Sequence, residues 1–321
     1  MNQLVAVEMG AVAEASQDPV TVYLAGLAPS GRRAMKSRLE AAVLLFQGKT
    51  PGSGKPSLDM PWHQLTYAHV SALRTRLQDT YQSAATINMT LAAVRGVARA
   101  AFMVGRMAAD EYQRIREVKP ARGASLPKGR ALNRGEVEAL LDTCEDTNAG
   151  RRDAALLALM YTSGLRRSEA VGLHRNAYDA ETGELRVTGK GGKERLLYVV
   201  NGTAEAMADY LAVRGAEPGF LFLPSRKGGE LENRGMTAQA IYAILQDRQK
   251  RAGIKPCSPH DFRRSFITSL LEGDVDLGTV QKLAGHSNIA TTARYDRRDE
   301  KAKRRAVETL HVGYRRRAAA N

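Results

Sequence analysis

Cysteine, tryptophan and long apolar runs are all scarce in this chain of 321 residues. Two cysteines and one tryptophan are present, and two thiols are too few for a disulfide framework or a four-ligand zinc site. No window reaches the roughly 18–20 consecutive apolar residues of a transmembrane helix, and the start lacks the pattern of a signal peptide. A P-loop and a carboxylate pair spaced for magnesium are also absent. We therefore expect a cytoplasmic protein without metal, cofactor or membrane partner.

Acidic residues are outnumbered by basic ones along the whole chain. Lys and Arg total 48 against 34 Asp and Glu, which gives a net charge of +14 and a pI near 9.9. A pI above about 9 is typical of proteins that bind a polyanion such as nucleic acid. Residues 1–120 carry a net +5 and residues 121–321 a net +9. Both parts are therefore expected to contact one long polyanion, and a merely soluble basic protein is the alternative.

The first third of the chain predicts a small all-α domain over 19–117, preceded by a leader over 1–18. Apolar residues at helical spacing predict one helix that begins near Ser30, with this serine as its N-cap. The same spacing predicts two further helices, over 69–78 and 86–104.

Basic residues on the third predicted helix and in the segment after it are candidates for nucleic-acid backbone contacts. Residues 118–131 include KPARGASLPKGR, which has four basic side chains and no acid and is typical of an exposed linker. A basic stripe on a helix is often only a solvated face, and that alternative stays open. The candidates are Arg95, Arg99, Lys119, Arg122, Lys128 and Arg130.

Residues 132–312 predict a mostly helical domain with one small antiparallel sheet. Asn133 and Glu136 have the spacing of a capping box at a helix start. Residues 153–161 are apolar nearly all round, which predicts a buried helix. The runs ELRVTG and RLLYVV flank a glycine turn and predict a hairpin. Residues 313–321 form a basic tail.

Four short motifs carry residue types suited to phosphoryl transfer. They are GLRRSEAVGL at 164–173, TGKGGKERL at 188–196, HDFRRSF at 260–266 and LAGHSNIATTARY at 283–295. In this order and spacing they resemble the four active-site boxes of the tyrosine site-specific recombinases, or integrase family. The resemblance covers roughly residues 130–312, with a weaker match over 20–115.

The residues themselves suggest how such a site is held. Arginine suits phosphate because its planar guanidinium donates to two oxygens and stays charged. Arg166 follows a Gly-Leu turn and should open a helix, with Glu169 one turn later to brace it. The Ser-Pro pair at 258–259 predicts a helix start that puts His260 and Arg263 on one face.

The resemblance implies a role for each matching residue. Tyr295 would be the nucleophile that forms a covalent 3′-phosphotyrosine. Lys190 would protonate the leaving 5′ oxygen, with Lys193 as the alternative. Arg167 and Arg264 are candidates for contacts with the DNA backbone. The implied catalytic set is Arg166, Lys190, His260, Arg263, His286 and Tyr295.

The implied fold is mainly α, with an N-terminal helical core-binding domain (SAM-like) and an α+β catalytic domain, and without an arm-binding domain. The implied enzyme recombines double-stranded DNA at inverted-repeat half-sites, as a tetramer, through a Holliday junction and without a cofactor. We expect it to serve integration, excision or cointegrate resolution of a mobile element, in a bacterial or phage setting and associated with the nucleoid. An accessory DNA-binding protein is a further candidate partner.

Three other functions remain open at this point. They are a type IB topoisomerase, a non-catalytic DNA-binding relative, and an RNA-binding or structural basic protein. After Tyr295, residues 299–311 predict a C-terminal helix with a narrow apolar stripe. The resemblance implies that this helix docks on a neighbouring protomer, and packing on its own domain is the alternative.

Overall fold

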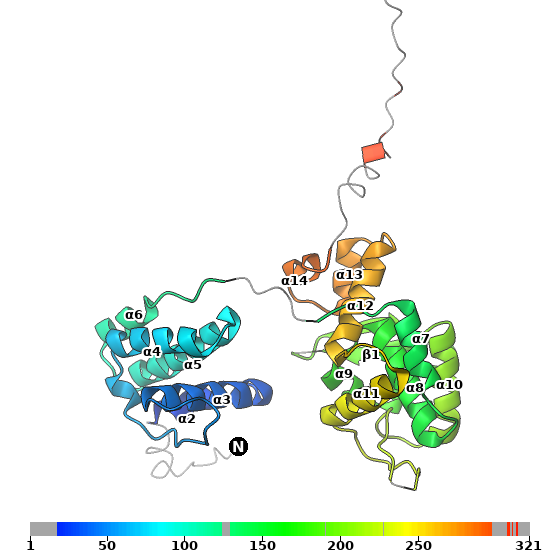
Figure 1. Cartoon of the computed structure of the whole chain (residues 1–321), viewed down its shortest axis with the longest axis horizontal. Helices are drawn as coiled ribbons and strands as arrows, with labels where there is room; N and C mark the ends of the chain where they lie inside the picture. Colours follow the sequence, from blue (N-terminus) through cyan, green and yellow to red (C-terminus); the bar gives the residue numbers. More distant parts are fainter. Residues whose placement is uncertain are drawn as a thin grey trace, which may run out of the picture. The chain divides into compact units, whose positions relative to one another are not determined.

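A computed structural model of the chain describes residues 18–123, 129–189, 191–226 and 228–296, together with 307, 308, 310 and 313. The chain divides into two compact units, Met1–Lys128 and Gly129–Asn321 (Figure 1). Helices dominate the described part of both units, and the second also holds one small antiparallel sheet. The expected mainly α fold is confirmed.

The first unit is organised around one long helix, α5. This helix packs against α2, α3, α4 and α6, and its buried face includes Leu91, Val94 and Val97. At Gly96 the ring of Tyr23 fills the space that a Cβ would occupy, so α2 lies close against α5. The elements of the unit are α2 (Pro19–Ala25), α3 (Pro29–Phe46), η1 (Trp62–Gln64), α4 (Tyr67–Thr80), α5 (Ala84–Met103) and α6 (Ala109–Arg116).

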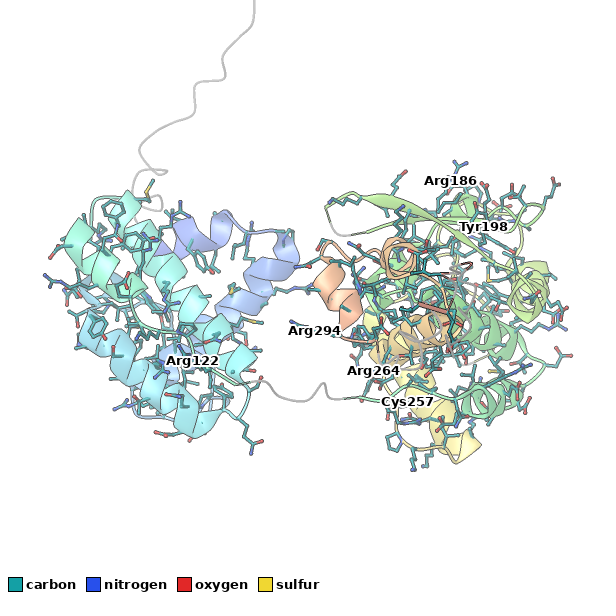
Figure 2. All side chains as sticks on the ribbon, turned by 90° about the horizontal axis from the view of Figure 1, so that it is seen from above. Arg122, Arg186, Tyr198, Cys257, Arg264 and Arg294 are labelled. Atoms are coloured by element: carbon teal, nitrogen blue, oxygen red, sulfur yellow. The ribbon has the colours of Figure 1, made fainter. Side chains whose placement is uncertain are left out.

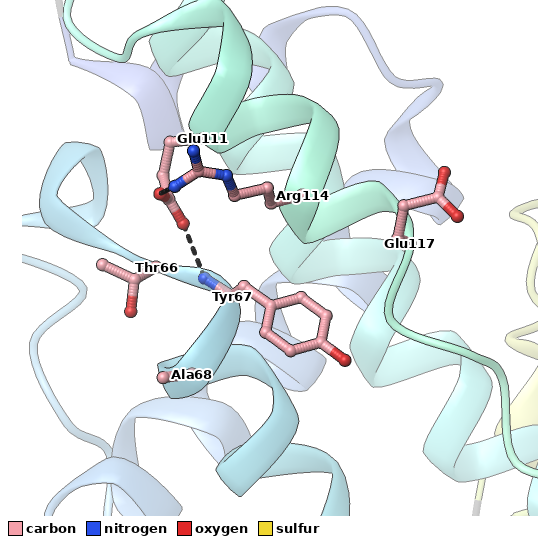
Figure 3. A pocket seen from close by; sticks show the side chains of 6 residues that line it. All are labelled: Thr66, Tyr67, Ala68, Glu111, Arg114 and Glu117. Carbon is pink, nitrogen blue, oxygen red and sulfur yellow. Dashed lines mark hydrogen bonds and ion pairs between the residues drawn. The ribbon is translucent and has the colours of Figure 1, made fainter.

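A carboxylate ties the last helix of this unit to the start of α4. Glu111 accepts a hydrogen bond of 2.7 Å from the backbone N–H of Tyr67, in a hollow that Arg114 and Glu117 also line (Figure 3). The first N–H groups of a helix have no intrahelical partner, so Glu111 satisfies one that would otherwise face solvent. None of the predicted catalytic residues lies in this hollow.

The helices predicted over 69–78 and 86–104 are confirmed, as α4 and α5. The helix expected to begin at Ser30 begins one residue earlier, at Pro29, so Ser30 lies inside α3 and is not its N-cap. Proline is favoured there because the first helical position needs no N–H donor.

The second unit has its core between α8, α10 and α12, with α8 buried along most of its length. Strands β1 and β2 pair antiparallel, with Val187 opposite Arg195, and Gly191 and Gly192 have φ of 79° and 74° in the turn. Its elements are α7 (Arg134–Asp142), α8 (Asn148–Ser163), α9 (Arg167–Gly172), η2 (Arg175–Ala177), β1 (Glu184–Thr188), β2 (Glu194–Tyr198), α10 (Gly202–Arg214), α11 (Ala238–Ala252), α12 (Pro259–Glu272), α13 (Leu277–Ala284) and α14 (Ile289–Ala293).

Some sequence predictions fall on residues that the structure does not describe. These are residues 1–17 of the predicted leader, Lys128, Lys190, and the C-terminal helix and basic tail apart from residues 307, 308, 310 and 313. No helix within the described residues is both long and apolar enough to span a membrane.

Candidate active site

The first part of the site in chain order is the turn between α8 and α9. Gly164 ends α8 in the left-handed conformation, with φ of 57°, and a Cβ there would clash with the ring of Phe266. The carbonyl of Gly164 accepts a hydrogen bond of 2.7 Å from Arg263 Nη1. Glycine is therefore required both by the backbone and by the close approach of α12.

Arg166 is held by Glu169 from one side. The backbone N–H of Arg166 donates to Glu169 Oε2 at 2.9 Å, and its Nη1 donates to Oε1 at 2.7 Å. Its Nη2 donates to the carbonyl of Gly285 at 3.3 Å. The Arg166 side chain is 38% exposed, whereas that of Glu169 is 4% exposed. A buried carboxylate thus orients a guanidinium that remains open to an anion from solvent.

Glu169 has a second partner, Arg195, which the sequence reasoning missed. Arg195 Nη2 donates to Glu169 Oε2 at 2.8 Å and Nη1 donates to Oε1 at 3.2 Å. Burial raises the pKa of Glu169, but the hydrogen bonds from Arg195 and Arg166 outweigh it and hold the pKa below its usual range. The strand pattern contained a signal, because Arg195 shares a face of β2 with buried Leu197. A cation on an inward face needs a buried partner.

Helix α12 begins as predicted, with Ser258 at the N-cap and Pro259 at the first position. Asp261 Oδ2 accepts from the Ser258 N–H at 2.9 Å and from its Oγ at 2.8 Å. This arrangement fixes the first turn of α12, from which His260 and Arg263 extend.

Arg263 is buried, with 1% of its surface exposed. Its Nη1 and Nη2 donate to the carbonyls of Gly164 and Ala284. Burial, followed by the charge of Arg166, lowers the pKa of Arg263 to about 10, so it stays charged at neutral pH. Among the described residues, no carboxylate lies within ion-pair distance of it. The site therefore holds a positive charge that an anionic group can compensate.

His286 and Tyr295 come from the segment that follows α13. His286 Nδ1 lies 2.8 Å from Thr292 Oγ1, and its ring stacks on that of Tyr295 with centroids 6.4 Å apart. Burial, followed by the charges of Arg263 and Arg166, lowers the pKa of His286 to about 4. The ring is therefore neutral at physiological pH.

Tyr295 faces two groups from α12. Its Oη lies 3.5 Å from His260 Nε2, and the guanidinium of Arg264 lies over its ring, 5.3 Å from the centroid. Desolvation, followed by the charges of Arg263 and Arg264, lowers the pKa of His260. The hydroxyl of Tyr295 thus lies at the edge of a cationic cluster, next to a neutral imidazole.

Three predicted catalytic residues line one pocket of about 330 Å³, which is hollowed between α9 and α12. They are Arg166, His260 and Arg263, and exposed Arg167 lies beside them. Lys190 lies outside the described residues. Lys193 is exposed in the hairpin turn.

The candidates for DNA contact fall into two groups. Arg99, Lys119, Arg122 and Arg167 are exposed, and Figure 2 labels Arg122. The other group makes contacts within the protein. Arg95 donates to the carbonyl of Val118, and burial lowers its pKa.

Arg130 and Arg264 belong to the second group. Arg130 pairs with Glu136 at 2.7 Å and donates to the carbonyl of Lys255 at 2.6 Å. Arg264, labelled in Figure 2, is buried beside Asp261, with Nε and Oδ1 separated by 3.8 Å. These side chains are held in place before any DNA arrives. Lys128 lies outside the described residues.

Within the described residues, no group of three or more His, Cys, Asp or Glu side chains is arranged to hold a metal ion. The groups that gather in the pocket and around Tyr295 are arginines, imidazoles and a phenol. Such a set can bind a phosphodiester, stabilise negative charge on its oxygens and supply a nucleophile.

Comparison with known proteins matches this chain to integrases and tyrosine recombinases. The sequence pattern of the phage integrase family matches residues 130–302. The chain is 36% identical over 269 residues to tyrosine recombinase XerC of Azotobacter vinelandii, covering 80% of this chain and 84% of the relative. It is 35% identical over 246 residues to tyrosine recombinase XerD of Corynebacterium glutamicum, covering 72% and 78%.

Solved structures share the fold at low sequence identity. The Tn1549 transposon integrase in complex with transposon right end DNA has a TM-score of 0.62 at 18% identity, covering 91% of this chain and 99% of that one. A lambda integrase dimer bound to a core site has a TM-score of 0.62 at 15% identity, covering 87% and 91%.

Proposed function

Because the chain belongs to the phage integrase family of tyrosine recombinases, we propose that it cleaves and rejoins DNA through Tyr295. One observation carries this assignment. Arg166, His260 and Arg263 line one pocket, and His260 and His286 lie beside Tyr295, so three segments of one compact unit meet there. The chain is a DNA recombinase, and the roles of these residues are the proposal.

The reaction needs no external energy source. The oxygen of Tyr295 attacks phosphorus, the bond to the 5′ oxygen breaks, and a 3′-phosphotyrosine forms. His260 Nε2, which is 3.5 Å from the Tyr295 hydroxyl, accepts the phenol proton. Lys190 donates a proton to the leaving 5′ oxygen. The phosphodiester energy is retained in the tyrosine link, so a second 5′ hydroxyl can reverse the step on a new partner strand.

Arg166 and Arg263 stabilise charge on the non-bridging oxygens during the attack. Arginine suits this task because it donates two parallel hydrogen bonds and remains charged. His286 is neutral and donates one more hydrogen bond. If the hydroxyl of Thr292 donates to Nδ1 of His286, the ring proton is on Nε2, which is the tautomer that can donate to the phosphate.

The partner is double-stranded DNA with inverted-repeat half-sites, bound by a tetramer.

Residues 19–117 form a helical DNA-binding domain, 118–131 a linker and 132–312 the catalytic domain. The break between the two compact units after Lys128 supports this division. The proposal includes a role in moving a mobile element in the bacterial cytoplasm, and the tyrosine recombinases of bacteria to which the chain is similar support the bacterial setting. An accessory protein is a further partner to test.

The test is covalent capture on DNA that the full chain selects from a random duplex pool. The selected site is nicked a few nucleotides to the 3′ side of the cleavage position, so the short fragment that carries the freed 5′ hydroxyl is lost and the adduct is trapped. We expect the wild type to form an SDS-stable adduct. Tyr295→Phe should bind equally well and form none, because only the attacking oxygen is removed.

Tyr198→Phe is the matched control, because this substitution also removes one phenol oxygen. Tyr198 is 57% exposed on the hairpin (Figure 2). An adduct with Tyr295→Phe would overturn the assignment. Relaxation of plasmids that lack the selected site would favour a topoisomerase instead.

A further inference from the structure

Glu169 accepts hydrogen bonds from two arginines that come from different elements. Its Oε1 accepts from Arg166 Nη1 at 2.7 Å and from Arg195 Nη1 at 3.2 Å. Its Oε2 accepts from the Arg166 N–H at 2.9 Å and from Arg195 Nη2 at 2.8 Å. The Arg195 pair is bidentate, which fixes the plane of the carboxylate as well as its position.

Arg195 also contacts the segment that leads to His286. Its Nε donates to the carbonyl of Leu283 at 3.1 Å. A Cβ at Gly285 would lie 3.1 Å from Arg195 Nη1, and Gly285 has φ of 63°. The guanidinium therefore packs against the backbone where α13 ends. One side chain on β2 thus touches both the support of Arg166 and the backbone next to His286.

The base of the hairpin turn lies against the same pair. Gly189 donates its N–H to the carbonyl of Lys193 at 2.7 Å. A Cβ at Gly189 would lie 3.6 Å from Arg195 Nη1 and 3.7 Å from Glu169 Oε1. Gly189 directly precedes Lys190 in the sequence. The backbone at Gly189, from which the turn departs, therefore runs close beside the Arg195–Glu169 pair.

We propose that Arg195 is a positioning residue that joins three parts of the active site: Arg166, the hairpin turn of Lys190 and the His286 segment. The inference rests on the proposed function and adds a residue to it. Arg195 acts through its neighbours and not on the phosphate, because it does not line the pocket of Arg166, His260 and Arg263 and, unlike Arg263, it has its charge paired with a carboxylate, Glu169.

The experiment compares Arg195→Gln and Arg195→Lys with the control Arg186→Gln. Arg186 is exposed on β1 of the same hairpin (Figure 2), so its replacement removes an equal charge without touching Glu169. Single-turnover adduct formation and affinity are measured on the selected nicked duplex, under conditions where all variants are folded by circular dichroism.

We expect Arg195→Gln to slow cleavage about 100-fold, the usual cost of displacing catalytic groups by about 1 Å. Its affinity should match that of Arg186→Gln. Arg195→Lys should also be slow, since an ammonium cannot make the bidentate pair. Glu169→Gln combined with Arg195→Gln should be no slower than the slower single variant, because the two residues act as one unit.

A substrate with sulfur at the 5′ bridging position separates positioning from general damage. A thiolate leaves without a proton, so this substrate does not depend on Lys190. On this sulfur substrate we expect Arg195→Gln to regain the part of its cleavage rate that was lost through misplacement of Lys190. The part that is not regained reflects the misplacement of Arg166 and His286. Equal slowing on both substrates would overturn the link to the hairpin turn.

Failure of the inference is distinct from failure of the proposed function. If the wild type forms no adduct, the proposed function is wrong. If the wild type forms it and Arg195→Gln cleaves as fast as Arg186→Gln, only the role of Arg195 is wrong.

Discussion

His286 is a titratable group whose folded environment favours the neutral ring. Its pKa is about 4 in the folded chain, against about 6.5 for an unperturbed histidine. Between these values the unfolded chain binds a proton that the folded chain does not. Stability is therefore unaffected by this group above about pH 6.5 and declines as the pH falls towards 4.

We expect His286→Gln to reduce this acid-side loss, because glutamine does not titrate and can still hydrogen-bond to Thr292. The measurement is the midpoint of urea unfolding at pH values from 7 to 4 for both proteins. If the two midpoints fall in parallel, the histidine does not carry the effect.

Single residues of the site were predictable where a motif fixed both type and spacing. The prediction that His260 and Arg263 extend from one helix start is confirmed by α12. The surroundings of single arginines were harder to predict. Arg95 and Arg130 have the sequence context of exposed cations, yet backbone carbonyls and Glu136 hold them. Such partners are distant in sequence and are brought near only by tertiary packing.

At the scale of elements, the end of α8 is coupled to Arg263 through one glycine. We expect Gly164→Ala to lower both stability and cleavage rate, because the added methyl would clash with Phe266 and displace the carbonyl that Arg263 binds. The matched control is Gly253→Ala at the end of α11. Gly253 has φ of 63° with nothing near its Cβ position. The Gly253→Ala substitution therefore adds only the backbone strain of a left-handed alanine, about 1 kcal/mol.

The excess destabilisation of Gly164→Ala over Gly253→Ala, measured by urea unfolding, should be about 1–3 kcal/mol, as for overpacking of a buried site. Cleavage should fall only in the Gly164 variant. Equal effects of the two substitutions on both quantities would contradict the coupling.

Outside the motifs, elements were predictable in proportion to their length and periodicity. The hairpin was predicted from its alternation around a glycine turn, and α4 and α5 from long amphipathic repeats. Helices α2 and α6 were missed because seven or eight residues give too few turns for a periodic signal. The fold class could be predicted from the longer elements alone.

At the scale of the whole molecule, positive charge is shared between the two units. Residues 1–120 carry a net +5 and residues 121–321 a net +9. We expect a fragment of residues 129–321 to bind the selected duplex much more weakly than the full chain. The logarithm of its affinity should also fall less steeply with the logarithm of salt concentration, because fewer phosphate contacts release fewer counterions.

Fluorescence anisotropy from about 50 to 200 mM salt measures both quantities, over a range in which 6–10 phosphate contacts would cost about 10³–10⁵ in affinity. Circular dichroism of the fragment verifies its fold. Equal slopes for fragment and full chain would mean that the first unit makes no phosphate contacts.

Tyr295 lies beside His260, Arg264 and His286 of its own chain. We therefore expect each subunit to cut only the strand that it holds, and this expectation has a genetic consequence. Two defective alleles, Arg166→Ala and Tyr295→Phe, should therefore fail to complement each other when coexpressed. A Tyr295→Phe chain that still binds and assembles should instead be dominant over the wild type, since every mixed assembly contains a strand that is never cut.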